Sequence, residues 1–157
     1  MEPRFALYEN EIGEKFTKRL AAASQAAEGS SLPKATQELV KIRASQINGC
    51  GVCTDMHTKD AAYRGETAVR LNLVAAWREA TVFTEAERAA LALTEEGTRL
   101  ADAHGGVTDE TWQLARKHYD DDQISALIVL VATINAWNRL NVIVRMPAGG
   151  YEPGAWG

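Results

Sequence analysis

The sequence has 157 residues, of which 46% are hydrophobic and 24% charged, and its formal net charge at pH 7 is -4. This composition predicts one globular domain, residues 1–157, with its own core. The mild acidity and the lack of a basic run argue against nucleic acid or an anionic membrane as the partner. No export-signal pattern opens the chain, and its most apolar stretch, residues 124–134, has about half the length of a membrane span. We therefore expect a cytoplasmic protein without a membrane partner.

The spacing of apolar residues predicts an all-α fold of about seven helices. In the first expected helix Tyr8, Ile12 and Phe16 recur every four residues, and Thr84 with Glu87 forms a capping-box pattern at the start of another. The expected helices cover about residues 4–27, 34–47, 50–64, 66–77, 85–103, 109–118 and 120–144. No segment shows sustained alternation of apolar and polar residues, so no strand is expected.

The pair Asn48–Gly49 breaks the helical pattern between residues 34–47 and 50–64. Both residues tolerate the left-handed conformation that ends many helices. A hairpin of these two helices would bring Glu38, on the first, to the face of the second.

Both cysteines of the chain lie at the start of that second helix, as Cys50 and Cys53, and His57 follows. Helical residues three and four apart share one face, with Cβ atoms roughly 5–6 Å from each other. A thiol pair and a base would therefore lie on one stripe of the helix. In a reducing cytosol such a pair is more typical of redox chemistry or metal binding than of a static crosslink.

Three features favour the thiolate of Cys53, which is the reactive form of the group. They are the positive end of the helix dipole, the second thiol, and His57 as the acceptor of the proton. A carboxylate that accepts a hydrogen bond from the imidazole would orient it, which gives a relay of Glu38, His57 and Cys53. Glu28 and Asp55 are alternative partners for His57.

Two plainer roles for the cysteine pair stay open. A C-x-x-C can be half of a zinc site, with His57 and either His104 or His118 as further ligands, although neither of these has a typical ligand spacing. A structural disulfide also fits the spacing, though a cytosolic setting disfavours it. His104 and His118 are otherwise interpreted as helix-end residues, and Arg43 as a structural ion-pair partner.

The pattern Glu38-x11-Cys50-x-x-Cys53-x-x-x-His57, with residues 43–49 ahead of the cysteines, resembles the core signature of the AhpD-like alkylhydroperoxidases of the carboxymuconolactone decarboxylase superfamily. The segment of residues 135–139, Asn-Ala-Trp-Asn-Arg, is similar to a second recurrent segment of that family. The resemblance is best over about residues 30–145.

This resemblance implies an AhpD-like helical fold that assembles as a homo-oligomer, a trimer or a hexamer. It also implies that Cys53 attacks a peroxide oxygen and becomes a sulfenic acid, and that Cys50 then condenses with it to a disulfide. Glu38 and His57 would relay the proton. An external dithiol, in some relatives a lipoyl group on a partner protein, would reduce the disulfide, and no bound cofactor or metal is implied.

The leading prediction is therefore a thiol-dependent peroxidase acting on hydrogen peroxide or organic hydroperoxides. Two alternatives remain. A decarboxylase-type lactone enzyme would use proton transfer by Glu38 and His57 and would not need the cysteines. A non-enzymatic redox-sensing oligomer would cycle the disulfide without turnover.

Overall fold

The computed structural model describes residues 2–102 and 105–155, which form seven α-helices, two short 3-10 helices and no strand. This confirms the predicted all-α fold class. The α-helices are α1 (Glu11–Glu28), α2 (Lys34–Ile47), α3 (Gly51–Tyr63), α4 (Ala68–Leu73), α5 (Glu85–Thr98), α6 (Asp109–His118) and α7 (Asp121–Val144), and the 3-10 helices are η1 (Leu7–Glu9) and η2 (Val74–Ala76).

The N-terminal helix begins later than residue 4, the predicted start. Asn10 is its N-cap, because the side chain of Asn10 accepts hydrogen bonds from the backbone N–H groups of Ile12 and Gly13. The regularly spaced Ile12 and Phe16 are 79% and 50% exposed, so they do not face the core of the chain. Helix α1 instead lies against α7, and the indole of Trp137 in α7 donates to the hydroxyl of Ser24 at 3.4 Å.

Two further boundaries differ from the prediction. The single helix expected over 66–77 divides into α4 and η2. Helix α5 ends at Thr98 rather than near residue 103. His104, interpreted above as a helix-end residue, lies outside the described residues.

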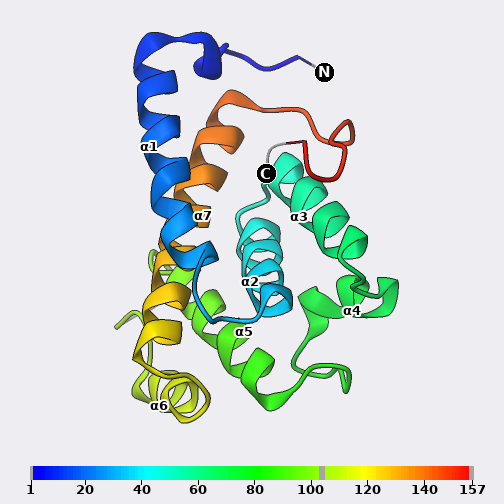
Figure 1. The fold of residues 1–157 in the computed structure, drawn as a ribbon, viewed down its shortest axis with the longest axis vertical. Coiled ribbons are helices and arrows are strands. Elements are labelled where there is room, and N and C mark those ends of the chain that lie inside the picture. Colours follow the sequence, from blue (N-terminus) through cyan, green and yellow to red (C-terminus); the bar gives the residue numbers. More distant parts are fainter. Residues whose placement is uncertain (1, 103–104, 156–157) are drawn as a thin grey trace.

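Helix α2 is central to the fold. Figure 1 shows it between the α1–α7 pair and α3, and it also contacts α5. Residues 36–45 are all buried, although they include Glu38, Lys41 and Arg43. Because an unpaired buried charge is costly, each of these groups needs a partner inside the protein. The partners of Glu38 define the site described below.

Helix α7 is long and apolar enough to span a membrane on length and composition alone. It packs along α1, α2 and α5, and Leu127, Leu130 and Ile134 on this helix are buried in the core. A core helix of a globular protein meets the same criterion, and α7 serves as one here.

Candidate active site

The turn between α2 and α3 positions the first cysteine. Gly49 adopts a left-handed conformation with φ 66°. The backbone N–H groups of Gly49 and Cys50 donate to the carbonyls of Gln46 and Ser45, at 3.3 and 2.9 Å. These two bonds form a Schellman motif, which ends α2 where the sequence predicts a break. Cys50 is thus the last residue of that motif and also the N-cap of α3.

Two asparagines of α7 hold this turn in place. Asn48 in the turn donates its side-chain amide to the Oδ1 atoms of Asn135 and Asn138, both at 2.9 Å. Asn138 in turn donates to the hydroxyl of Ser45 at 3.0 Å. The segment of residues 135–139 therefore supports the turn that carries Cys50.

The sulfurs of Cys50 and Cys53 are joined as a disulfide in the structure. Both cysteines are buried, and they belong to a small apolar cluster with Ala44, Val52 and Ile134. In the described part of the chain no group of three or more His, Cys, Asp or Glu side chains could hold a metal ion. The donor set of a zinc site is therefore not assembled among these residues.

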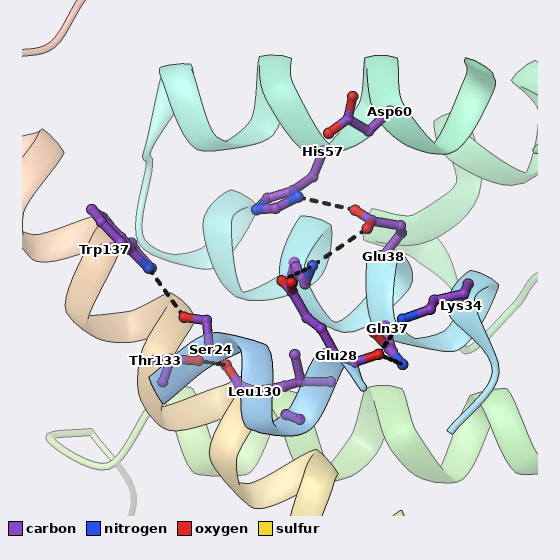
Figure 2. A network of polar contacts seen from close by, with 12 residues as sticks. Ser24, Glu28, Lys34, Gln37, Glu38, His57, Asp60, Leu130, Thr133 and Trp137 are labelled. Atoms are coloured by element: carbon purple, nitrogen blue, oxygen red, sulfur yellow. Dashed lines mark hydrogen bonds and ion pairs between the residues drawn. The ribbon is translucent and has the colours of Figure 1, made fainter. Parts of the chain in front are cut away.

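His57 lies one turn after Cys53 on α3 and is buried. Its Nδ1 atom is 2.9 Å from Oε2 of Glu38, across the helix hairpin. Figure 2 shows this contact, with the other ring nitrogen of His57 pointing away from Glu38 and Asp60 turned away from the carboxylate. The structure thus joins Glu38 and His57 directly, without a bridging group.

The charge state of Glu38 follows from its surroundings. Burial alone would raise the pKa of Glu38, but the hydrogen bond and charge of His57 and the charges of Lys41 and Arg64 lower the pKa to about 2. The Lys41 ammonium and the Arg64 guanidinium lie 3.4 and 3.1 Å from Oε1. At neutral pH Glu38 is therefore ionised and can only accept hydrogen bonds. The proton must then reside on Nδ1 of His57, which leaves Nε2 as the basic nitrogen of the neutral ring.

The alternative partners for His57 make other contacts. Glu28 accepts from the ammonium of Lys41 at 2.9 Å. Asp55 accepts from backbone N–H groups of the C-terminal segment. Arg43 is ion-paired, as interpreted from the sequence, and its partner is Glu95 of α5 at 2.6 Å.

Asn141, which is absent from the predicted site, contacts the disulfide, and Tyr8, also absent from it, contacts Asn141. The side-chain Nδ2 of Asn141 in α7 lies 3.4 Å from Sγ of Cys53. Its Oδ1 accepts from the hydroxyl of Tyr8 in η1 at 2.6 Å. The available sequence signal is slight, since Asn141 is a polar residue between Leu140 and Val142 near the end of an apolar helix.

Two cavities border the site on different sides. One of about 280 Å³ lies beside the disulfide, and Cys50 forms part of its wall whereas Cys53 does not. Its lining consists of Gly49, Cys50, Gly51, Val52, Asn141, Val142, Arg145 and Met146. The other, of about 190 Å³, borders Glu38 and Arg64. The disulfide and the carboxylate therefore open toward separate spaces.

The helical arrangement has close counterparts among solved structures. A protein of unknown function from Agrobacterium tumefaciens, provisionally assigned as the antioxidant defence protein AhpD, superposes with a TM-score of 0.87 at 32% identity, over 96% of this chain and 100% of that one. An uncharacterised peroxidase-related protein from Ralstonia eutropha, described as an alkylhydroperoxidase AhpD core, gives 0.75 at 17% identity, over 87% of this chain and 72% of that one. The debrominase Bmp8 with 2,3,4-tribromopyrrole gives 0.77 at 14% identity, over 87% and 72%. These last two likenesses show the fold alone, and together the three define an AhpD-like helical fold.

The sequence comparisons give the family. The model of the carboxymuconolactone decarboxylase family matches residues 14–96. The uncharacterised protein YdfG of Bacillus subtilis is 40% identical over 129 residues, which are 82% of this chain and 80% of that protein. The uncharacterised protein YnjA of Escherichia coli is 28% identical over 121 residues, 77% of this chain and 65% of that protein. The chain therefore belongs to the carboxymuconolactone decarboxylase family, which confirms the resemblance found in its sequence.

Proposed function

We propose that the protein is an enzyme, a thiol-dependent peroxidase that reduces hydrogen peroxide or organic hydroperoxides through Cys50 and Cys53. One observation carries this proposal. Cys53, which is disulfide-bonded to Cys50, lies on α3 one turn before the imidazole of His57, and the Nδ1 atom of that imidazole is 2.9 Å from an ionised carboxylate. This arrangement keeps the other nitrogen of His57 available as a base for a thiol on the same helix.

In the proposed cycle the reduced Cys53 gives its proton to Nε2 of His57 and attacks the distal peroxide oxygen as a thiolate. The O–O bond breaks, and the leaving alkoxide or hydroxide takes the proton back from His57 to form an alcohol or water. Cys53 is left as a sulfenic acid. The thiol of Cys50 then gives up its proton and attacks the Cys53 sulfur, and the displaced hydroxyl takes up that proton and leaves as water, which forms the disulfide. Glu38 remains ionised throughout, so its role is to orient the imidazole and stabilise its positive charge.

Regeneration requires an external two-electron donor. We propose a dithiol, such as a lipoyl group on a partner protein, that enters the cavity beside Cys50. One thiolate of the reductant attacks the sulfur of Cys50, and the disulfide breaks. The second thiol then closes the reductant's own disulfide and releases Cys50 reduced. We also propose that the protein is cytoplasmic, where dithiol reductants of this kind are available.

We also propose that the protein acts as a homo-oligomer, either a trimer or a hexamer. The apolar residues Phe5, Ile12 and Phe16 are all at least half exposed along the N-terminal segment and α1. An apolar face of this kind is typical of a surface that another subunit covers. The mass in solution tests this, and a monomer at micromolar concentration would refute it.

The decisive experiment for the peroxidase is a stopped-flow titration of the reduced protein with peroxide, followed by mass analysis of the Cys50–Cys53 pair. Cys53→Ser should abolish turnover. Cys50→Ser should allow one oxidation of Cys53 and then stall. If both variants keep full activity with a dithiol reductant, the proposal is wrong.

The same variants separate the two alternatives. Activity on a lactone that survives alkylation of both thiols would indicate a decarboxylase-type enzyme that uses Glu38 and His57. The direct contact of these two residues is what such chemistry would need. Normal formation and reduction of the disulfide without peroxide turnover would indicate a redox sensor.

A further inference from the structure

Asn141 and Tyr8 form a hydrogen-bonded pair that ends at the sulfur of Cys53. The amide nitrogen of Asn141 is 3.4 Å from that sulfur, and the amide oxygen accepts from the Tyr8 hydroxyl at 2.6 Å. We propose that Asn141 is a catalytic residue that stabilises Cys53 as a thiolate, and that Tyr8 is the residue that positions its amide. This inference rests on the proposed thiol chemistry and adds two residues from outside the Glu38–His57 pair.

Tyr8 determines which end of the amide faces the sulfur. The side chain of Asn141 has a donor end and an acceptor end, and either one fits the space. Partial burial raises the pKa of Tyr8, although the hydrogen bond to Asn141 acts in the opposite direction. The phenol is therefore protonated at neutral pH and donates to the amide oxygen, which leaves the NH₂ group toward Cys53. A flipped amide would place its oxygen beside the sulfur and repel a thiolate.

The segment just before the turn that carries Tyr8 is fixed to the end of α7. The backbone N–H of Arg4 donates to the carbonyl of Val144 at 2.8 Å. The turn also packs on α1 at Gly13, where an added Cβ would lie only 2.0 Å from the carbonyl oxygen of Leu7. The N-terminal segment thus has a defined place beside the site, and Tyr8 reaches Asn141 from a position held on two sides.

A charge develops on the Cys53 sulfur at two points of the proposed cycle. The first is the loss of its proton to His57. The second is reduction, when the reductant's sulfur bonds to Cys50, the Cys50–Cys53 bond breaks, and Cys53 leaves with the electron pair. The Asn141 amide already lies at this sulfur in the disulfide state, so it need not move when the charge forms. A hydrogen bond to a charged acceptor is also stronger than one to a neutral acceptor.

The test measures the ionisation of Cys53 directly. In a Cys50→Ser background Cys53 is the one thiol of the chain, since the sequence has two cysteines. Its pKa follows from the thiolate absorbance near 240 nm as the pH is raised. Adding Asn141→Ala should raise this pKa by about one unit, as expected for the loss of one hydrogen bond to a charged group. Adding Asn141→Asp should raise it further, because a carboxylate repels the thiolate.

Tyr8→Phe should raise the same pKa by about half a unit, because the amide is then free to turn. The matched control is Tyr151→Phe, which removes a hydroxyl 3.0 Å from Asp60 on the same α3 and should leave the pKa unchanged. In a double-mutant cycle, Tyr8→Phe should have no further effect once Asn141 is alanine.

Two results would overturn the inference. One is an unchanged pKa in both Asn141 variants, and the other is an effect of Tyr8→Phe that persists without the Asn141 side chain. Peroxide takes no part in this experiment, so its outcome is independent of whether the protein proves to be a peroxidase.

Discussion

Two buried glutamates, Glu38 on α2 and Glu95 on α5, look alike by burial and charge. They are 6% and 3% exposed. In both, burial acts to raise the pKa, and hydrogen bonds and nearby cations more than offset this effect, so that the pKa is lowered. The donors to Glu95 are Arg43, Trp77, Arg78 and Arg99.

The difference between the two lies in the chemistry of their donors. Guanidinium and indole groups do not release a proton near neutral pH, so Glu95 is a fixed structural anchor. One oxygen of Glu38 binds His57, which can gain and lose a proton, and its other oxygen is held by Lys41 and Arg64. A buried carboxylate therefore indicates a functional site only when a titratable partner connects it to reactive groups.

The largest expected difference between the two glutamates concerns the rate at which Cys53 reacts with peroxide. Glu38→Gln should slow the reaction of Cys53 with peroxide about 10²–10³-fold per folded molecule. The reason is that an amide can donate to Nδ1 of His57 and so favour the wrong tautomer. Stopped-flow kinetics measures this rate. Glu95→Gln is the matched control and should change it less than about twofold, so an equal loss in both variants would contradict the distinction drawn here.

For the free energy of unfolding, Glu95 should matter more than Glu38. Glu95→Ala should lower the free energy of unfolding by about 3–5 kcal/mol, because it leaves the buried Arg43 without its partner. The side chains of Arg78 and Arg99 are about half exposed and can turn to water. Urea denaturation measures the loss. The double variant Arg43→Met/Glu95→Leu should recover much of it, and failure to do so would mean that the ion pair is not the cause.

The acid sensitivity of the fold should depend on Glu38. Its pKa is about 2 in the folded protein against 4.5 for a glutamate side chain in water, so its ionised form favours folding. This contribution, on the order of 3 kcal/mol, is present above about pH 4.5 and is lost as the pH falls toward 2. Denaturation at a series of pH values should show the loss in the native protein. In Glu38→Gln that part of the pH dependence should disappear, and an unchanged profile would contradict the assignment.

The hairpin and its motif could be predicted from the sequence because they depend on local spacing. Cys50, Cys53 and His57 lie within eight residues of one another, and the break at Gly49 depends on the conformational freedom of that residue. Asn10 is also a local signal, an N-cap residue in the middle of an apparent helical period. Asn10 thus encodes the start of α1 locally, whereas the four-residue period alone predicts a helix that begins too early, at residue 4.

The remaining contacts could not be predicted because they join distant parts of the chain. Arg64 reaches Glu38 across 26 positions, and Asn141 reaches Cys53 across 88. Helical periodicity fixes which residues share a face but not which faces meet, so these partners follow only from the packing of the helices. The same holds for the ion pair of Arg43 with Glu95, whose residues are 52 positions apart.

The smallest expected effect concerns the two cations of Glu38. The side chain of Arg64 is 51% exposed, whereas that of Lys41 is 9% exposed. Water screens an exposed charge, so Arg64→Ala should lower the free energy of unfolding by less than about 1 kcal/mol. Lys41→Met should cost more, because it removes the buried partner that Glu38 shares with Glu28.

Urea denaturation at pH 7 compares these two variants. The part of each deficit that comes from ionised Glu38 should shrink as the pH falls from about 4.5 toward 2, where Glu38 of the native protein also gains its proton. A loss for Arg64→Ala as large as that for Lys41→Met would contradict the screening argument. It would mean that the cavity of about 190 Å³ beside Glu38 excludes water despite the exposure of Arg64. Glu38 would then resemble Glu95 in the strength of its cationic partners, and His57 alone would distinguish the two sites.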